Sequence, residues 1–284
     1  MKKLFLVSAA LILLTACSKD EKSIWSKDDG RLNIVTNINP MRVSSDESGN
    51  ERFTNGDKIL ITMRDEASNV LYADYVKGES NYYWSDFAFG ESVRKVSFAG
   101  CYPKPENHVT SFVFDVTSAS TKDLLLAPET SYDKGNSFVQ LIFRHAMSKL
   151  VVNYSVGSGV NEEDLPSVKT ELTAKPSCNV DIIASTVVAD NKPAVKFEEI
   201  GKNVSFMIPP QKVQGMNLRI MFKGKEKIFN LKELFTENNM QDDSLIGGKK
   251  MVVNLAVTKD DVLFVSTNIL PWEEQGRVNG TVSL

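Results

Sequence analysis

The chain has few of the residues that build catalytic and metal sites. Of its 284 residues, only two are histidine and three are cysteine. Neither His108 nor His145 stands at a zinc-ligand spacing from a cysteine or from the other histidine. The sequence also lacks a Gly-x-Ser-x-Gly nucleophile elbow and a glycine-rich phosphate loop before a helix. We therefore predict no metal site, no cofactor and no catalytic residues, and we do not expect an enzyme.

An excess of basic residues is also absent. The chain carries 33 lysine and arginine residues against 36 aspartate and glutamate residues, with a net charge of -3 and a pI near 5.6. Proteins that bind nucleic acid usually present a basic face to the phosphate backbone. We therefore expect no nucleic-acid partner.

Long apolar runs are missing as well, apart from one short run near the start. Lys2 and Lys3 precede the run from Leu4 to Leu14, which is shorter than the roughly 20 residues of a membrane-spanning helix. A charged start, an apolar run and small residues are typical of a secretory signal. We predict a signal peptide over residues 1–16.

The residues Leu14-Thr15-Ala16-Cys17 resemble the bacterial lipobox, in which the cysteine is acylated and becomes the first residue of the mature protein. The alternative is an ordinary signal peptide whose cysteine falls there by chance. Each buried acyl CH₂ contributes about 0.8 kcal/mol, and a second chain turns marginal binding into stable anchoring. We predict palmitate-type lipidation of Cys17.

Residues 17–30 form a polar, charged segment that we predict to be a lipidated tether. Ser18-Lys19-Asp20-Glu21 resembles the acidic export signal of Bacteroidetes lipoproteins. The resemblance implies an anchor in the cell outer membrane with the protein exposed on the surface. An anchor facing the periplasm is the alternative.

The remaining cysteines and one histidine are predicted to lie in the core. Cys101 and Cys178 are flanked by apolar, strand-like residues, which favours buried free thiols over a disulfide. His145 alternates with Phe143 and Met147, which places it on the inner face of a strand as a hydrogen-bonded core residue.

After residue 30, apolar residues recur at every second position in many short segments. This spacing turns one face of a β-strand toward a core, and short strands between closely spaced turns are typical of β-sandwiches and barrels. The segments are Leu32 to Ile38, Ile59 to Met63, Leu71 to Tyr75, Phe112 to Val116, Val139 to Phe143, Leu150 to Val156, Val204 to Ile208, Leu218 to Phe222 and Met251 to Val257. We predict an all-β fold of antiparallel sheets.

The length of the mature chain predicts two sandwiches, since one holds about 100 residues. We place the N-terminal β-sandwich at residues 31–135 and the C-terminal one at 136–284, because a polar stretch at 129–136 separates them. Lys223-Gly224-Lys225 predicts a tight turn between antiparallel strands. Leu231 to Phe235 is the one short segment that indicates a helix.

Aromatic residues gather between Tyr82 and Phe89. Tyr83 and Trp84 are candidates for a ligand platform, because flat rings stack on the apolar faces of sugars. The same cluster fits two strands of core, and we favour core packing.

Several segments together resemble the fimbrillin family of Bacteroidetes surface lipoproteins, whose members include pilus shaft, tip and anchor subunits. No single segment is specific, and their order together with the lipobox carries the resemblance. The segments are Phe53-Thr54-Asn55-Gly56-Asp57-Lys58-Ile59, Phe98-Ala99-Gly100-Cys101-Tyr102-Pro103, Asp123-Leu124-Leu125-Leu126-Ala127, Phe143-Arg144-His145-Ala146-Met147-Ser148-Lys149-Leu150, Gly247-Gly248-Lys249-Lys250 and Ile269-Leu270-Pro271-Trp272.

The resemblance implies two transthyretin-like β-sandwich domains and assembly by strand exchange. In shaft subunits of that family the first strand is cut away after an arginine, and the next subunit supplies a strand to the vacated groove. Arg42 follows the first predicted strand and is our first choice for the cleavage site, with Arg52 second. A surface arginine that is never cut is the alternative. Residues 276–284 are either a donated strand or the last strand of the second sandwich.

Two functions from different classes follow. The first is a structural subunit of a cell-surface fimbria, a shaft, tip or anchor component that contributes to adhesion. Its partners would be other fimbrial subunits, the outer membrane through the lipid, and a host or bacterial surface ligand. The second is a surface lipoprotein that captures glycans, with Tyr83 and Trp84 as its platform.

Overall fold

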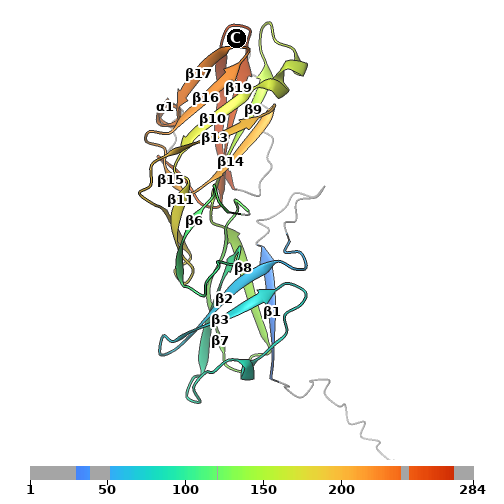
Figure 1. Ribbon diagram of the computed structural model, residues 1–284, viewed down its shortest axis with the longest axis vertical. Coiled ribbons are helices and arrows are strands. Elements are labelled where there is room, and N and C mark those ends of the chain that lie inside the picture. The colour runs from blue at the N-terminus through green and yellow to red at the C-terminus, as the bar shows by residue number, and fades with distance from the viewer. Residues whose placement is uncertain (1–29, 39–51, 120, 238–242, 272–284) are drawn as a thin grey trace, which may run out of the picture.

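The computed structural model describes residues 30–38, 52–119, 121–237 and 243–271. Two lobes stack along the long axis, with the earlier strands in the lower lobe and most later strands in the upper lobe (Figure 1). The strands are β1 Arg31–Ile38, β2 Lys58–Asp65, β3 Val70–Val76, β4 Tyr82–Tyr83, β5 Lys95–Tyr102, β6 Ser111–Asp115, β7 Leu125–Asp133, β8 Phe138–His145, β9 Ser148–Val156, β10 Lys169–Ala174, β11 Ser177–Asp181, β12 Thr186–Ala189, β13 Val195–Ile200, β14 Asn203–Ile208, β15 Gln211–Lys212, β16 Asn217–Phe222, β17 Lys225–Asn230, β18 Ser244–Leu245, β19 Lys249–Val257 and β20 Val262–Pro271. The helical segments are η1 Trp84–Asp86, η2 Glu162–Ser167 and α1 Leu231–Glu237. The predicted all-β fold is confirmed.

The lower lobe is built on one sheet of seven strands in the order β3-β2-β5-β7-β8-β1-β4. Alternation decides which side chains face inward: on β8, Val139, Leu141 and Phe143 are buried, whereas Phe138 and Ile142 are exposed. The buried side chains of β1, β2, β3, β5, β7 and β8 meet in one apolar core. Leu32 and Ile34 of β1 are part of this core, which holds the first strand in place.

The upper lobe is a sandwich of two four-stranded sheets, β14-β9-β19-β20 and β13-β10-β16-β17. Their inner faces enclose a second core, to which α1 adds Leu231, Leu234 and Phe235. The side chain of Asn230 accepts a hydrogen bond from the Lys232 amide at 2.9 Å and so caps the start of α1. Among the described strands, the pairs β1–β8 and β9–β19 are parallel and the other pairs are antiparallel.

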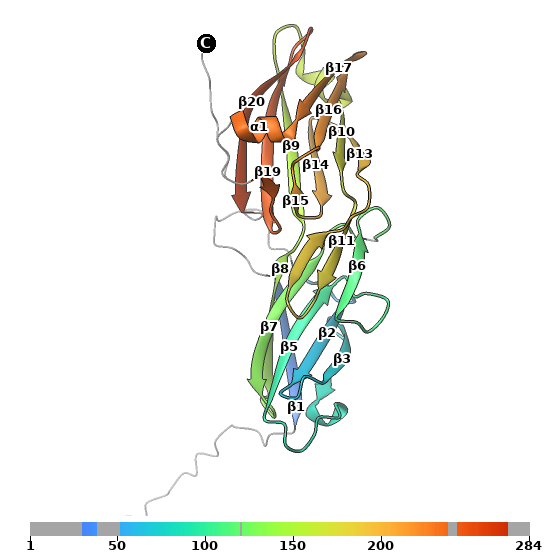
Figure 2. The ribbon, with the colours of Figure 1, turned by 90° about the vertical axis from the view of Figure 1, so that its left-hand side faces the viewer.

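A three-stranded sheet, β12-β11-β6, joins the two halves of the chain at the waist between the lobes (Figure 2). Strand β6 comes from the first half, and it pairs with β11 from the second half over five residues, from Ser111↔Asp181 to Ser177↔Asp115. Beneath this sheet lies a third core that contains Leu60 and Leu126 from the first half and Cys178 and Val180 from the second. The halves therefore share hydrogen bonds and apolar contacts.

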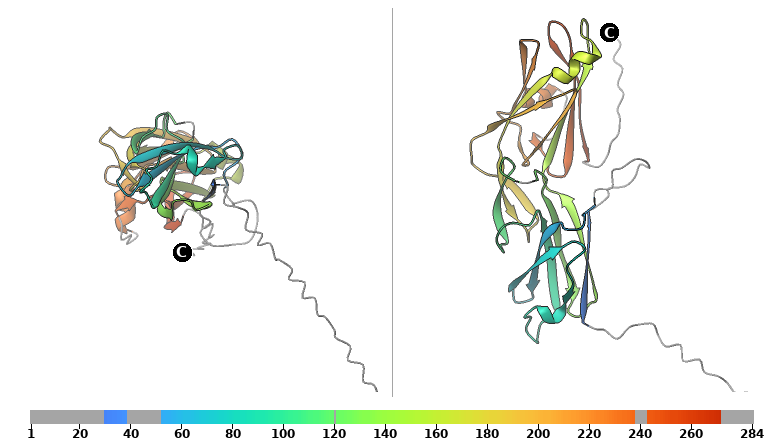
Figure 3. Two further views of the ribbon diagram at one scale, coloured as in Figure 1. Left: turned by 90° about the horizontal axis from the view of Figure 1, so that it is seen from below. Right: turned by 45° about the vertical axis from the view of Figure 1, so that its right-hand side comes forward.

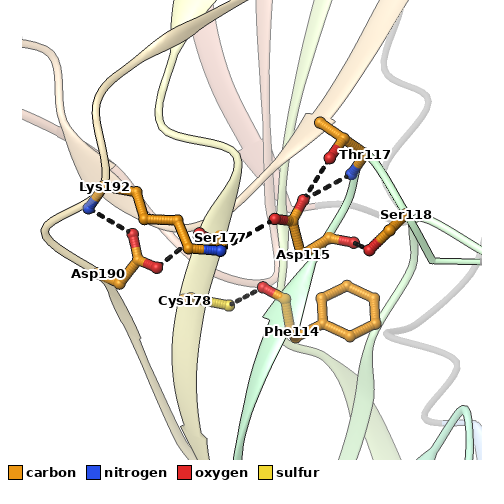
Figure 4. Close-up of polar contacts among 8 residues, drawn as sticks. All are labelled: Phe114, Asp115, Thr117, Ser118, Ser177, Cys178, Asp190 and Lys192. Atoms are coloured by element: carbon orange, nitrogen blue, oxygen red, sulfur yellow. Dashed lines mark hydrogen bonds and ion pairs between the residues drawn. The ribbon is translucent and has the colours of Figure 1, made fainter.

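Polar contacts secure the same joint (Figure 4). Lys192 lies after β12 and donates to Asp115 at the end of β6 at 3.2 Å. Asp190 accepts a hydrogen bond from the Ser177 hydroxyl group at 2.6 Å. Burial, the largest single influence, raises the pKa of Asp115, but hydrogen bonds from the Thr117 hydroxyl and amide groups and from Lys192 hold it below its usual range. The hydrogen bond from Ser177 is the main influence that lowers the pKa of Asp190.

Sheet membership does not change at residue 135. Strand β8 follows that position and pairs with β1 and β7 of the lower sheet, whereas β9 enters the upper sandwich. The chain passes from one lobe to the other at Ala146 and Met147. The division of the chain into two domains at residues 31–135 and 136–284 stays a prediction, and the sheet pairing favours a later crossing point.

The predicted turn at Lys223 and Gly224 is confirmed. Both residues have positive φ, 46° and 80°, and they join β16 to β17. Two consecutive residues with positive φ match the right-handed twist of a two-residue hairpin. Glycine has no Cβ to clash in this conformation, which explains its place at the second position.

Candidate functional site

Strand β1 is the candidate functional element, and its inward face is firmly packed. Leu32, Ile34 and Thr36 are 2%, 8% and 4% exposed, and they alternate with outward-facing residues. Burying an aliphatic side chain of this size stabilises by about 1.5–3 kcal/mol. The apolar residues of β1 therefore fill part of the lower core.

The two edges of β1 differ. Along one edge, residues Asn33 to Ile38 pair in parallel with Phe138 to Phe143 of β8. Along the other edge only Arg31 and Leu32 have strand partners, in the two-residue strand β4. Beyond Leu32, no described strand pairs with this second edge. Figure 3 shows β1 at the margin of the lower lobe.

Side chains replace a strand along the open edge. The Tyr75 hydroxyl group donates to the Ile34 carbonyl at 3.2 Å, and Lys77 donates to the Thr36 hydroxyl group at 3.5 Å. Tyr75 belongs to β3, and Lys77 belongs to the turn after β3. In the strand order of the sheet, β3 lies at the opposite end from β1. The sheet thus curls until its two ends meet, and the gap is closed by side chains. Burial raises the pKa of Tyr75, so the phenol stays protonated and able to donate.

Strand β8, the main partner of β1, is itself weakly attached on its other side. It pairs with β7 only at Leu125↔His145 and Leu126↔Arg144. Further along, the Tyr132 hydroxyl group donates to the Gln140 carbonyl at 2.9 Å and accepts from the Gln140 amide at 3.1 Å. If β1 left, β8 would expose unpaired backbone groups, and the lower core would lose Leu32 and Ile34.

Two of the predicted site residues, Cys17 and Arg42, lie outside the described residues. The described chain resumes at Arg52, which is exposed, and Phe53, which is 8% exposed. Phe53 packs edge-on against Phe143 at 5.0 Å and against Tyr102 at 5.3 Å between ring centroids. Phe53 therefore holds the chain in the lower core just after the segment that contains Arg42.

The aromatic cluster lies largely inside the lower lobe. Trp84 is 7% exposed, its ring packs edge-on against Phe98, and its indole nitrogen donates to the Asn136 carbonyl at 2.9 Å. Tyr83 is 41% exposed. The two residues of the predicted platform thus differ in accessibility, and the platform stays a prediction.

The cysteines and His145 lie where the pattern predicted. Cys101 and Cys178 are free and buried, and burial raises the pKa of both thiols, that of Cys178 to about 12. The residue His145 is 7% exposed, and the Nδ1 atom of its ring lies 2.9 Å from a carboxylate oxygen of Asp123. His108 is on the surface, stacked on Tyr72 and 2.8 Å from Asp74.

The polar groups that close the sheet were missed at the sequence level. Tyr75 belongs to the alternating pattern and resembles an ordinary strand aromatic, whereas Tyr132 falls in the polar stretch at 129–136 that was predicted to separate the domains. Their hydroxyl groups acquire a role only because the sheet curls and because β7 and β8 diverge.

Within the described ranges, no three histidine, cysteine, aspartate or glutamate side chains gather in a group that could hold a metal ion. Among the same residues no helix has both the length and the apolar character needed to cross a membrane.

A family model described as Fimbrillin-like matches residues 42–272 of the chain. No curated protein matches it in sequence. A candidate cell adhesion protein of Bacteroides uniformis has a similar structure, with a TM-score of 0.65 and 17% identity over 86% of this chain and 98% of that one. Another from Bacteroides ovatus gives a TM-score of 0.62 with 14% identity over 87% and 99% of the two chains. A third, from Parabacteroides distasonis, gives 0.52 with 7% identity over 88% and 99%. At these identities the structures show a shared fold.

Proposed function

The chain belongs to the Fimbrillin-like family, and from this premise we propose that it is a structural subunit of a cell-surface fimbria that assembles by strand exchange. A role in fimbriae or adhesion follows from the family. The finer proposal is that β1 occupies a groove that a strand of another subunit fills after β1 is removed.

The asymmetric attachment of β1 supports this proposal. Its parallel ladder with β8 is one-sided, and beyond Leu32 its other edge is held by the side chains of Tyr75 and Lys77. A strand built into the middle of a sheet would be bonded along both edges. A segment held along one edge can be replaced by another strand that offers the same backbone groups and similar apolar residues.

The location of the arginines supports removal of β1 by cleavage. Residues 39–51 separate β1 from the anchor at Phe53, and they contain Arg42. Cleavage after Arg42 or Arg52 would separate β1 from the rest of the chain without cutting a described strand. Lipidation of Cys17 would anchor the uncut form in the outer membrane.

Processing can be tested on cells that express the Arg42→Ala, Arg52→Ala and Arg94→Ala variants. Arg94 is an exposed loop arginine outside the proposed segment and serves as the matched control. We expect polymeric protein from the wild type and the control to begin just after Arg42, and the Arg42→Ala variant to lose polymer. Assembled polymer whose chains all still begin at Cys17 would contradict cleavage in this subunit.

The groove itself can be tested with a chain that begins at residue 43 and a synthetic peptide of residues 31–38. We expect the peptide to bind and to raise the midpoint of thermal unfolding, because it restores the ladder to β8. A peptide with Leu32 and Ile34 replaced by aspartate should not bind, since it would bury charges in the core. Equal effects of the two peptides would refute the groove.

The burial of Trp84 supports core packing in preference to a glycan platform. The ring is buried and its nitrogen is already hydrogen-bonded to Asn136. Replacement of Trp84 by alanine should therefore destabilise the lobe by about 3–5 kcal/mol. Denaturant unfolding measures this loss, and an unchanged stability with loss of glycan binding would instead favour the platform.

A further inference from the structure

A groove lies where the waist sheet meets the upper lobe. Its wall is formed by β12, by the end of β10 and by the two short paired strands β15 and β18. Its volume is about 530 Å³, within the roughly 300–1,000 Å³ that is typical of ligand sites. Apolar side chains supply much of the lining, among them Val187, Ala189, Pro210, Met216 and Leu245. The groove is therefore large enough for a short stretch of peptide and apolar enough to hold one.

Strand β12, which lines this groove, has one edge without a strand partner. It stands at the end of the sheet β12-β11-β6, so among the described strands it pairs with β11 alone. Beyond its last residue, the Asp190 amide donates to the Ser177 carbonyl at 3.0 Å. Bonded and non-bonded positions alternate along an antiparallel pair. The backbone groups of Val188 therefore face β11, whereas those of Val187 and Ala189 face away from it.

The free edge of β12 has little of the protection that edge strands usually carry. Natural edges are blocked by charged residues, by proline, by bulges or by short length. The residues of β12 are Thr186, Val187, Val188 and Ala189, and they pair with β11 without a bulge. Short length is therefore its main protection. Val188 is 63% exposed, so the strand presents apolar surface as well as backbone groups.

The charged residues in the lining of the groove are two lysines, and the lining contains no carboxylate. The Lys175 ammonium group donates to the Asp190 backbone carbonyl at 2.6 Å. The Asp190 carboxylate accepts a hydrogen bond from Ser177 and does not line the groove. Lys212 lies 3.9 Å from Asp243, and both of these side chains are largely exposed. An acidic group that enters the groove would therefore meet positive charge.

We propose that this groove binds an extended, acidic segment of another protein, which adds as a strand to the free edge of β12. The backbone of the segment bonds with Val187 and Ala189, its apolar side chains enter the groove, and its carboxylates lie against Lys175 and Lys212. A small anion would leave the strand edge unused, and a purely apolar segment would leave the lysines unused. The site is separate from β1 and does not depend on strand exchange there.

A short capped peptide in which valine and glutamate alternate serves as the probe. Fluorescence anisotropy measures its binding to the purified chain with β1 in place. We expect saturable binding, and slower amide hydrogen exchange at Val187 and Ala189 when the peptide is bound. The same peptide methylated on its backbone nitrogens should not bind, because it cannot donate to a strand edge. A peptide in which valine and lysine alternate should not bind either, because the two lysines of the groove repel it.

Variants of the chain test the charges and the edge separately. We expect Lys175→Gln/Lys212→Gln to bind the valine–glutamate peptide about tenfold more weakly than the wild type. Lys95→Gln is the matched control, since Lys95 is exposed on β5 in the lower lobe. Ala189→Pro should abolish binding, because proline removes an amide that faces away from β11 and so leaves the pairing with β11 intact. Circular dichroism and thermal unfolding establish that each variant folds.

The methylated peptide tests the strand edge on the unaltered protein, so the result does not depend on how Ala189→Pro folds. Equal affinity of the methylated and unmethylated peptides, or no binding of the unmethylated one, overturns the proposal. Protection of β8 in place of β12 would put the peptide in the lower lobe and also overturn it. Dimers of the chain that the peptide dissociates would show a second copy in the groove, with the same consequence. None of these outcomes depends on cleavage at Arg42 or on whether fimbriae form.

Discussion

At the residue scale, the lower core leaves no room for a side chain at Gly100. A Cβ atom there would lie 2.5 Å from Cζ of Phe143, a fully buried ring. We expect Gly100→Ala to destabilise the protein by about 1–3 kcal/mol, because the ring must shift in a close-packed core. Gly90→Ala is the control, since its Cβ would meet nothing closer than 3.9 Å. Urea unfolding compares the two, and equal losses would contradict the packing argument.

The buried thiols make a second prediction at this scale. Because burial raises the pKa of Cys178 to about 12 and that of Cys101 in the same direction, both stay protonated in the folded state at pH 8. We expect neither to react with a thiol reagent until denaturant is added. Unfolded thiols ionise above a pH of about 8.5. The contribution of the two thiols to the free energy of unfolding is therefore fully present below that pH. It falls as the pH rises toward the pKa values of the thiols in the folded state. Rapid labelling of the native protein would contradict this.

At the element scale, the Tyr75 hydroxyl group is the described contact that holds the Ile34 carbonyl on the open edge of β1. We expect Tyr75→Phe to destabilise by about 1–3 kcal/mol, because a buried carbonyl loses its donor. The rate of amide hydrogen exchange should increase in β1 before it increases elsewhere in the protein. Tyr72→Phe is the control, since its ring can still stack on His108. Faster exchange spread evenly over both lobes would argue against a local role in holding β1.

At the scale of the whole molecule, the shared third core couples the two halves. Leu60 and Leu126 of the first half pack in the same cluster as Cys178 and Val180 of the second. We expect one cooperative unfolding transition, because neither half can unfold without exposing this cluster. Ile61→Ala in the lower core and Leu165→Ala in the upper core should lower the same midpoint. Two separate midpoints that respond independently would contradict the coupling.

The alternating pattern predicted much of the fold because strands need only one face buried, and that requirement is visible in the sequence. It found the first strand at Leu32 to Ile38, the core positions of Cys101, Cys178 and His145, and the short helix at Leu231. Trp84 was correctly favoured as a core residue. These are local properties, set by side-chain polarity and spacing.

Other features depend on which strands lie beside each other in space. The pairing of β6 with β11, the parallel pairing of β1 with β8, and the closure of the curled sheet by Tyr75 join residues far apart in the chain. The sequence by itself determined the strands and the residues they bury, because period and polarity act locally. Only the tertiary structure decided that β1 pairs with a long strand along one edge and with two residues of β4 along the other, because that depends on which backbones meet when the sheet curls.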